Sequence, residues 1–164
     1  MAETQRRPVP RVDSGELDTA LAFLNFNRES VLKKTEGLDD EQLRRVLVDT
    51  GTNLLGLVQH LAQAERNWFG YHLTGTAAVR GPGSGMKVPR ARTTAEVLDD
   101  YRAAIAASDA AIRAIGDPEA HLARLVDGRH MTMRWLIAHM TSETARHAGH
   151  ADILREQIDG TTGR

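Results

Sequence analysis

The sequence predicts an all-α protein, an up-down four-helix bundle with a long loop between the second and third helices. Apolar residues recur at helical spacing in four long stretches, and no stretch alternates apolar and polar residues as a half-buried strand does. Most connections between these stretches are short, which favours helices that pack beside one another. The 164 residues, 41% of them apolar, suffice for one domain with a substantial core.

The expected domain covers residues 13–160 and follows a flexible arm of residues 1–12. The arm carries Pro8 and Pro10 among charged residues and shows no apolar periodicity. Because it has no apolar face to bury, we expect the arm to be mobile.

The first helix begins with a capping-box pattern, in which Asp13 is followed three residues later by Glu16. Its apolar spacing continues until Gly37, a residue typical of the position after a helix C-terminus. A short helical start follows, with Asp39 or Asp40 as its N-cap.

The second and third long helices also have recognisable ends. The second is expected from Thr52 to near Gly75. The third begins with a second capping box, Thr93 with Glu96, and ends at Gly116, which is followed by Asp-Pro. Residues 75–92 between them are rich in glycine and proline. A loop of this length in a compact domain is either a functional lid over a pocket or a surface excursion, and both readings stay open.

The fourth helix, from Thr132 to Gly160, carries a polar stripe on its apolar face. Steps of four, four and three residues place one carboxylate and three imidazoles within about one face: His139, Glu143, His147 and His150. The stripe is continued by leucine and isoleucine, which marks the side that a packed helix turns inward. Buried imidazoles and carboxylates are costly unless they are hydrogen-bonded, paired or bound to a metal.

A metal site is the first interpretation of this stripe. Glu143 and His147 are separated by one turn, so both can reach one point, and His60 on the apolar side of the second helix can supply a third ligand. Three protein ligands leave a position for water or substrate, as in catalytic zinc sites. Iron, nickel and manganese also accept these ligand types. The alternative is a buried hydrogen-bonded network without metal.

Composition excludes several other classes. The net charge is −1, with 21 basic and 22 acidic residues, so we expect no nucleic-acid partner. No apolar run is long enough to span a membrane, and the N-terminus lacks a secretory segment, so a cytoplasmic protein is expected. The chain has no cysteine, so any thiol chemistry would need a thiol from outside.

Two stretches carry a family resemblance: residues 53–66, NLLGLVQHLAQAER, and residues 135–152, WLIAHMTSETARHAGHAD. They resemble the DinB-like superfamily, and more narrowly its actinobacterial branch related to mycothiol-dependent maleylpyruvate isomerases and mycothiol S-transferases. The resemblance extends over residues 13–160. It implies a four-helix bundle, often paired as a homodimer, in which a divalent metal is bound at the positions of His60, Glu143 and His147.

The resemblance further implies a transferase of a low-molecular-weight thiol such as mycothiol to an electrophilic small molecule, with a metal-activated thiolate as nucleophile. In that case His150 is a candidate proton carrier or partner of His147, and His139 a candidate for orienting Glu143.

Three further residues are candidates for substrate binding. Arg66 and Arg146 could bind a carboxylate or a sugar hydroxyl, and Trp68 could form a pocket wall. Surface positions for the arginines and a core position for the tryptophan are the plain alternatives.

The activity itself has alternatives. The same scaffold suits a metal-dependent hydrolase or isomerase, or a non-catalytic stress-response module that binds a metal or ligand.

Overall fold

The computed structural model describes residues 8–76 and 86–163. This part contains five α-helices and one π-helical segment and no β-strand, which confirms the all-α prediction. None of its helices combines the length and the apolar character needed to cross a membrane. Residues 1–7 of the expected arm, and residues 77–85 of the long loop for which a lid role was considered, lie outside the described residues.

The N-terminal third contains α1, Glu16–Lys33, and the short α2, Asp40–Arg44. The capping box expected at the start of α1 is wrong: Gly15 is the N-cap residue, with φ 134°, and no side chain caps the helix. A glycine in this conformation replaces the side-chain cap that the Asp13 pattern predicted. Asp39 does cap α2, in a reciprocal capping box with Gln42.

The second long helix is α3, Leu54–Glu65, and its N-cap is Asn53, one residue after the expected start. It continues directly as the π-helical segment η1, Arg66–Leu73. The last two long helices are α4, Thr94–Ile115, capped by the predicted Thr93, and α5, Met133–Asp159, capped by the predicted Thr132. Both end at a glycine with positive φ, 66° at Gly116 and 77° at Gly160, as the sequence predicted.

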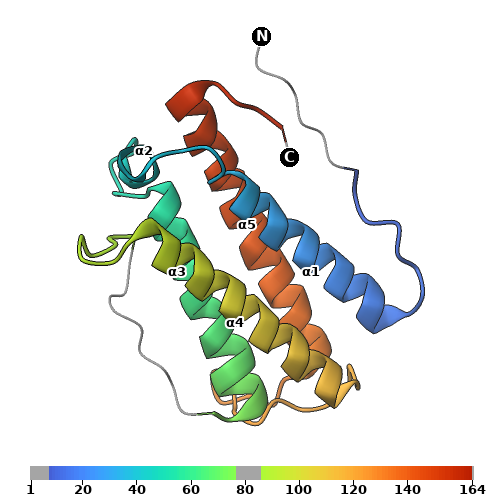
Figure 1. Ribbon diagram of the computed structural model, residues 1–164. Helices are drawn as coiled ribbons and strands as arrows, with labels where there is room; N and C mark the ends of the chain where they lie inside the picture. Colours follow the sequence, from blue (N-terminus) through green and yellow to red (C-terminus); the bar gives the residue numbers. More distant parts are fainter. Residues whose placement is uncertain (1–7, 77–85, 164) are drawn as a thin grey trace.

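The helix directions differ from the expected up-down alternation (Figure 1). Arg66 in η1 bonds to Asp100 in α4, and Gln59 in α3 bonds to Arg92 just before α4, so α3 and α4 run in the same direction. The main neighbour of α1 is α5, and these two helices are also parallel to each other. The pair α3 and α4 packs against the pair α1 and α5 and runs antiparallel to it.

The long connection permits this arrangement. Thr76 bonds to Gly70 near the end of η1, whereas Met86 bonds to Asn53 at the start of α3, so residues 76 and 86 lie at opposite ends of the same helical rod. A connection of this length can return along the rod and start α4 in parallel. Short connections, on which the up-down expectation rested, cannot do so.

The core consists of two apolar clusters. Leu57 and Leu61 of α3 belong to one, with Ala151 and Leu154 of α5. Leu136 and Met140 of α5 belong to the other, with buried residues of α1, η1 and α4. The two clusters involve successive parts of α5. The polar stripe on this helix begins at His139, beside Met140 of the second cluster, and ends at His150, beside Ala151 of the first.

Candidate metal centre

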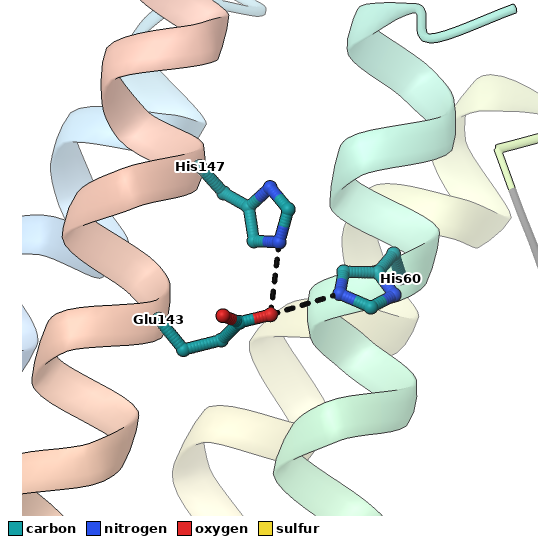
Figure 2. Close-up of side chains that lie close together, drawn as sticks. All are labelled: His60, Glu143 and His147. Atoms are coloured by element: carbon teal, nitrogen blue, oxygen red, sulfur yellow. Dashed lines mark hydrogen bonds and ion pairs between the residues drawn. The ribbon is translucent and has the colours of Figure 1, made fainter. Parts of the chain in front are cut away.

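Three side chains converge where α3 packs against α5. Figure 2 shows His60 on α3 and the pair Glu143 and His147 on α5 pointing toward one another. Nε2 of His147 is 2.9 Å from Oε1 of Glu143, and Nε2 of His60 is 3.3 Å from the same oxygen. One ligand atom from each residue lies within 4.8 Å of the other two. The structure thus brings together the three residues that the sequence analysis selected.

The local sequence explains these positions. Glu143 and His147 are four residues apart, so both project from the same side of α5. Thr144, which lies between these two residues, and Met140, which precedes them, are both fully buried and so fix which side of α5 faces inward. On α3, the fully buried Leu61 sets the face from which the neighbouring, half-buried His60 reaches α5.

The electrostatics of the cluster suit metal ligands. Burial raises the pKa of Glu143, but hydrogen bonds with His60 and His147 outweigh burial, so the pKa lies below the usual 4.5. Burial is the main cause that lowers the pKa of His147 below 6.5. At neutral pH the carboxylate is therefore charged and His147 is neutral, the forms in which both groups bind metal.

The second nitrogen of His147 also has a neighbour. Its Nδ1 atom lies 3.4 Å from Nδ1 of the exposed His150, one turn further along α5. The His60 and His147 rings meet edge to face with centroids 4.8 Å apart. A metal-binding histidine usually uses its free ring nitrogen in a hydrogen bond that fixes the ring, and His150 is placed to accept that bond.

This donor set fits a divalent metal. Two imidazole nitrogens and a carboxylate oxygen suit zinc, iron, nickel or manganese, and all three converge on one point. His147 is only 5% exposed, whereas the His60 and Glu143 side chains retain 35% and 23% exposure, so the cluster is open on one side.

Two hollows adjoin the cluster at different levels of α5. The tryptophan hollow, with a cavity volume of about 480 Å³, is lined by His60, Gln63, Ala64, Asn67, Trp68, His139 and Glu143. The isoleucine hollow, with a cavity volume of about 450 Å³, is lined by Val48, Thr50, Thr52, Met86, Arg146, His147, His150, Ile153 and Leu154. The three convergent side chains therefore lie between a hollow of mixed polar and apolar lining and a mainly apolar one.

His139 is placed by aromatic contacts. Its ring stacks on Trp135, with centroids 5.1 Å apart and planes 3° apart, and meets Trp68 edge to face at 4.5 Å. Trp68 comes from η1, a π-helical segment of the kind often found at functional sites. Trp68 lines the tryptophan hollow and also packs, partly buried, against the second apolar cluster, so both positions considered for it describe part of its surroundings.

The two candidate arginines lie in different surroundings. Both terminal nitrogens of Arg66 donate to Asp100 on α4, so this side chain faces away from the two hollows. Arg146 lines the isoleucine hollow, and within the described residues it has neither a hydrogen bond nor an ion pair.

Sequence reasoning missed the apolar walls of the isoleucine hollow. Ile153 follows His150 by three residues and lies beside, not within, the row of buried apolar residues of α5. A large apolar residue at such a position was a usable signal of an exposed apolar surface. Met86 carried no such signal because it belongs to the irregular connection. Its place depends on Gly56, where a Cβ atom would lie 2.1 Å from the Met86 carbonyl oxygen.

The fold and the convergent side chains define an all-helical protein with a candidate metal site between α3 and α5. The chain belongs to the mycothiol S-transferase family, whose family model matches residues 19–160. This match confirms the resemblance to the mycothiol-related branch. A search of curated proteins finds no match for the chain.

Proposed function

We propose that this protein is a metal-dependent S-transferase that transfers mycothiol, or a closely related thiol, to an electrophilic small molecule. The observation that carries the proposal is the convergence of His60, Glu143 and His147 within 4.8 Å in a member of the mycothiol S-transferase family. Zinc is the first candidate for the metal, and nickel, manganese and iron share the ligand preference. A cytoplasmic setting suits the reaction because small thiols are kept reduced there.

The chemistry follows from the donor set. His60, Glu143 and His147 would hold a divalent cation, and its positive charge would lower the pKa of a thiol and favour the thiolate at neutral pH. The sulfur electron pair forms a bond to the electrophilic carbon. The electron pair displaced at that carbon leaves with a leaving group or takes up a proton. The chain has no cysteine, so the sulfur must belong to the substrate.

The positions of the residues around the candidate ligands support a role for each of them. With a metal on Nε2, His147 would carry its proton on Nδ1, where His150 is placed to accept it and hold the ring in its binding orientation; His150 can also carry the thiol proton to solvent. His139, held between Trp68 and Trp135, lines the same hollow as Glu143, one turn earlier on α5, and this position supports a role in orienting that carboxylate. Arg66 is less suited to substrate binding than Arg146, because Asp100 already occupies its guanidinium.

The first experiment is metal analysis of protein purified without chelator. We expect bound metal in the wild type, loss of most of it in His60→Ala, and retention in His121→Ala, which removes an exposed histidine outside the cluster. Equal metal content in all three proteins would remove His60 from the ligand set and favour a metal-free polar network.

The second experiment measures consumption of mycothiol, glutathione and cysteine in the presence of an electrophile. We expect mycothiol to react fastest and Glu143→Ala to react no faster than the uncatalysed control. A metal-loaded wild type that consumes no thiol would instead be assayed for hydrolysis and isomerisation. The absence of thiol consumption would make the S-transferase proposal wrong; hydrolysis or isomerisation would then support one of the alternative enzymes, and the absence of both would leave a non-catalytic binding module.

A further inference from the structure

The tryptophan hollow and the isoleucine hollow differ in chemistry, although both adjoin the candidate metal ligands. His60 and Glu143 line the first, and His147 lines the second. A transfer reaction has two substrates that must both reach the same point. Two separate hollows at that point offer a place for each.

The tryptophan hollow has the chemistry that binds a sugar. Trp68 lines this hollow, and its ring is held by His72, which stacks on one of its faces with centroids 4.8 Å apart, and by His139, which meets it edge to face at 4.5 Å. Asn67, the residue before it, is exposed and lines the same hollow. An aromatic face packs against the C–H face of a sugar ring, and a carboxamide both donates to and accepts from hydroxyl groups. Mycothiol carries its cysteinyl thiol on a sugar-containing, hydroxyl-rich body.

The isoleucine hollow has the chemistry that binds an apolar molecule with one anionic group. Val48 and Ile153 are large apolar side chains with 36% and 57% exposure, and both line this hollow. Two exposed apolar side chains that line one mainly apolar hollow favour an apolar partner there. Arg146 lines the same hollow without an ionic partner among the described residues, so it can pair with an anion.

We propose that the two hollows divide the reactants: the sugar-bearing part of the thiol lies against Trp68 and Asn67, and the electrophile is an apolar molecule with an anionic group that lies against Ile153 and Arg146. This inference rests on the proposed S-transferase function, which supplies the two reactants. It names the class of electrophile and assigns a separate surface to each substrate.

The test uses two ligands that cannot react, so that binding is measured apart from turnover. S-methyl mycothiol represents the thiol, and naphthalene-1-sulfonate represents an apolar anion. Calorimetry with metal-loaded protein compares the wild type with variants of each hollow. The variants of the tryptophan hollow are Asn67→Ala, Trp68→Ala and Trp68→Phe. Those of the isoleucine hollow are Ile153→Asn and Arg146→Gln. Leu125→Asn, at an apolar residue that is 48% exposed and lines neither hollow, is the matched control.

We expect Trp68→Ala and Asn67→Ala to weaken S-methyl mycothiol binding by about fivefold or more, and Trp68→Phe to retain most of it, because one aromatic face is worth on the order of 1 kcal/mol. Naphthalene-1-sulfonate should lose a similar factor in Ile153→Asn and Arg146→Gln. Each set should leave the other ligand unaffected, and Leu125→Asn should bind both ligands normally. If Trp68→Ala folds poorly, the variant Asn67→Ala, which changes an exposed residue, tests whether the thiol binds in the tryptophan hollow.

Three results would overturn the inference: both ligands weakened by the same variants, neither ligand weakened by any of them, or a change of oligomeric state in Ile153→Asn, which would make this surface a contact between copies of the chain. Failure of the proposed function looks different, since both ligands would then bind in separate hollows without any thiol consumption.

Discussion

Nε2 of His147 lies 2.9 Å from Oε1 of Glu143, one turn earlier on α5. Burial lowers the pKa of His147 below 6.5 in the folded protein. Between the folded and the unfolded pKa, the unfolded chain binds more protons, so folding stability rises with pH through this window. Metal-free protein should therefore lose stability as the pH falls from about 7.5 through 6.5 toward the folded pKa.

The variant His147→Gln lacks this titrating group, so it should lose less stability over the same pH range. Urea unfolding of chelator-treated protein at several pH values measures both proteins. The other groups facing this ring are Glu143, His60 and His150, and all remain in the variant. Parallel pH curves for the two proteins would show that His147 is not the group responsible.

Gly56 and Gly149 offer a matched pair of helix glycines. A methyl group at Gly56 would meet the Met86 carbonyl oxygen at 2.1 Å, whereas one at Gly149 meets nothing within 4 Å. We expect Gly56→Ala to destabilise the protein by about 1–3 kcal/mol because backbone must move. Gly149→Ala should stabilise it by up to about 1 kcal/mol through helix propensity.

Urea unfolding compares the two variants with the wild type. Because Met86 lines the isoleucine hollow, Gly56→Ala should also disturb that hollow, while Gly149→Ala should preserve it. Stability changes of the same sign and size at both positions would contradict the close approach of Met86 to α3.

The sequence predicted best what depends on neighbouring residues. The capping box of Thr93 with Glu96 and the N-cap Thr132 are local patterns, and both occur as expected. The similar pattern at Asp13 failed because Gly15 provides the N-cap instead. A capping pattern indicates a helix start nearby, but a glycine in between can shift the N-cap, here by two residues from Asp13 to Gly15.

Features that depend on distant contacts were less accessible. The spacing of Glu143 and His147 made their approach predictable, but the 3.3 Å distance from His60 depends on how α3 packs on α5. The parallel course of α3 and α4 depends on where the long connection returns, which no periodicity reveals. Nor did any pattern mark η1 as π-helical, although this segment positions Trp68 beside the cluster.

His150 should act on metal affinity through His147. Its Nδ1 atom is 3.4 Å from Nδ1 of His147, and loss of such a partner typically lowers metal affinity by 10- to 100-fold. We expect that range for His150→Ala. His150→Asn should recover part of the affinity because the amide oxygen can accept the same hydrogen bond.

Competition against a zinc indicator measures these affinities, with His121→Ala as the control at an exposed histidine. If His150→Ala binds zinc as tightly as the wild type, His150 has no positioning role, and only its role as a proton carrier would remain to be tested by turnover.

Arg28 and Glu65 form the most deeply buried ion pair described in the structure. Both side chains are 1% exposed, and two guanidinium nitrogens of Arg28 donate to Glu65 at 2.8 and 2.6 Å. Glu65→Ala should cost about 3–5 kcal/mol of stability because it leaves a buried cation with only Asp109 as its charged partner. The exposed pair Arg102 and Asp99 is the control, and Asp99→Ala should cost less than about 1 kcal/mol.

A double variant separates the value of the pair from the cost of breaking it. Replacing both Arg28 and Glu65 with leucine removes both buried charges and should cost less than Glu65→Ala alone, because apolar substitutes can replace a buried pair at little cost. Asp109 then remains with 26% exposure and access to solvent. Urea unfolding of the single and double variants decides the question. A double variant less stable than Glu65→Ala would mean that the pair contributes net stability beyond neutralising its own charges.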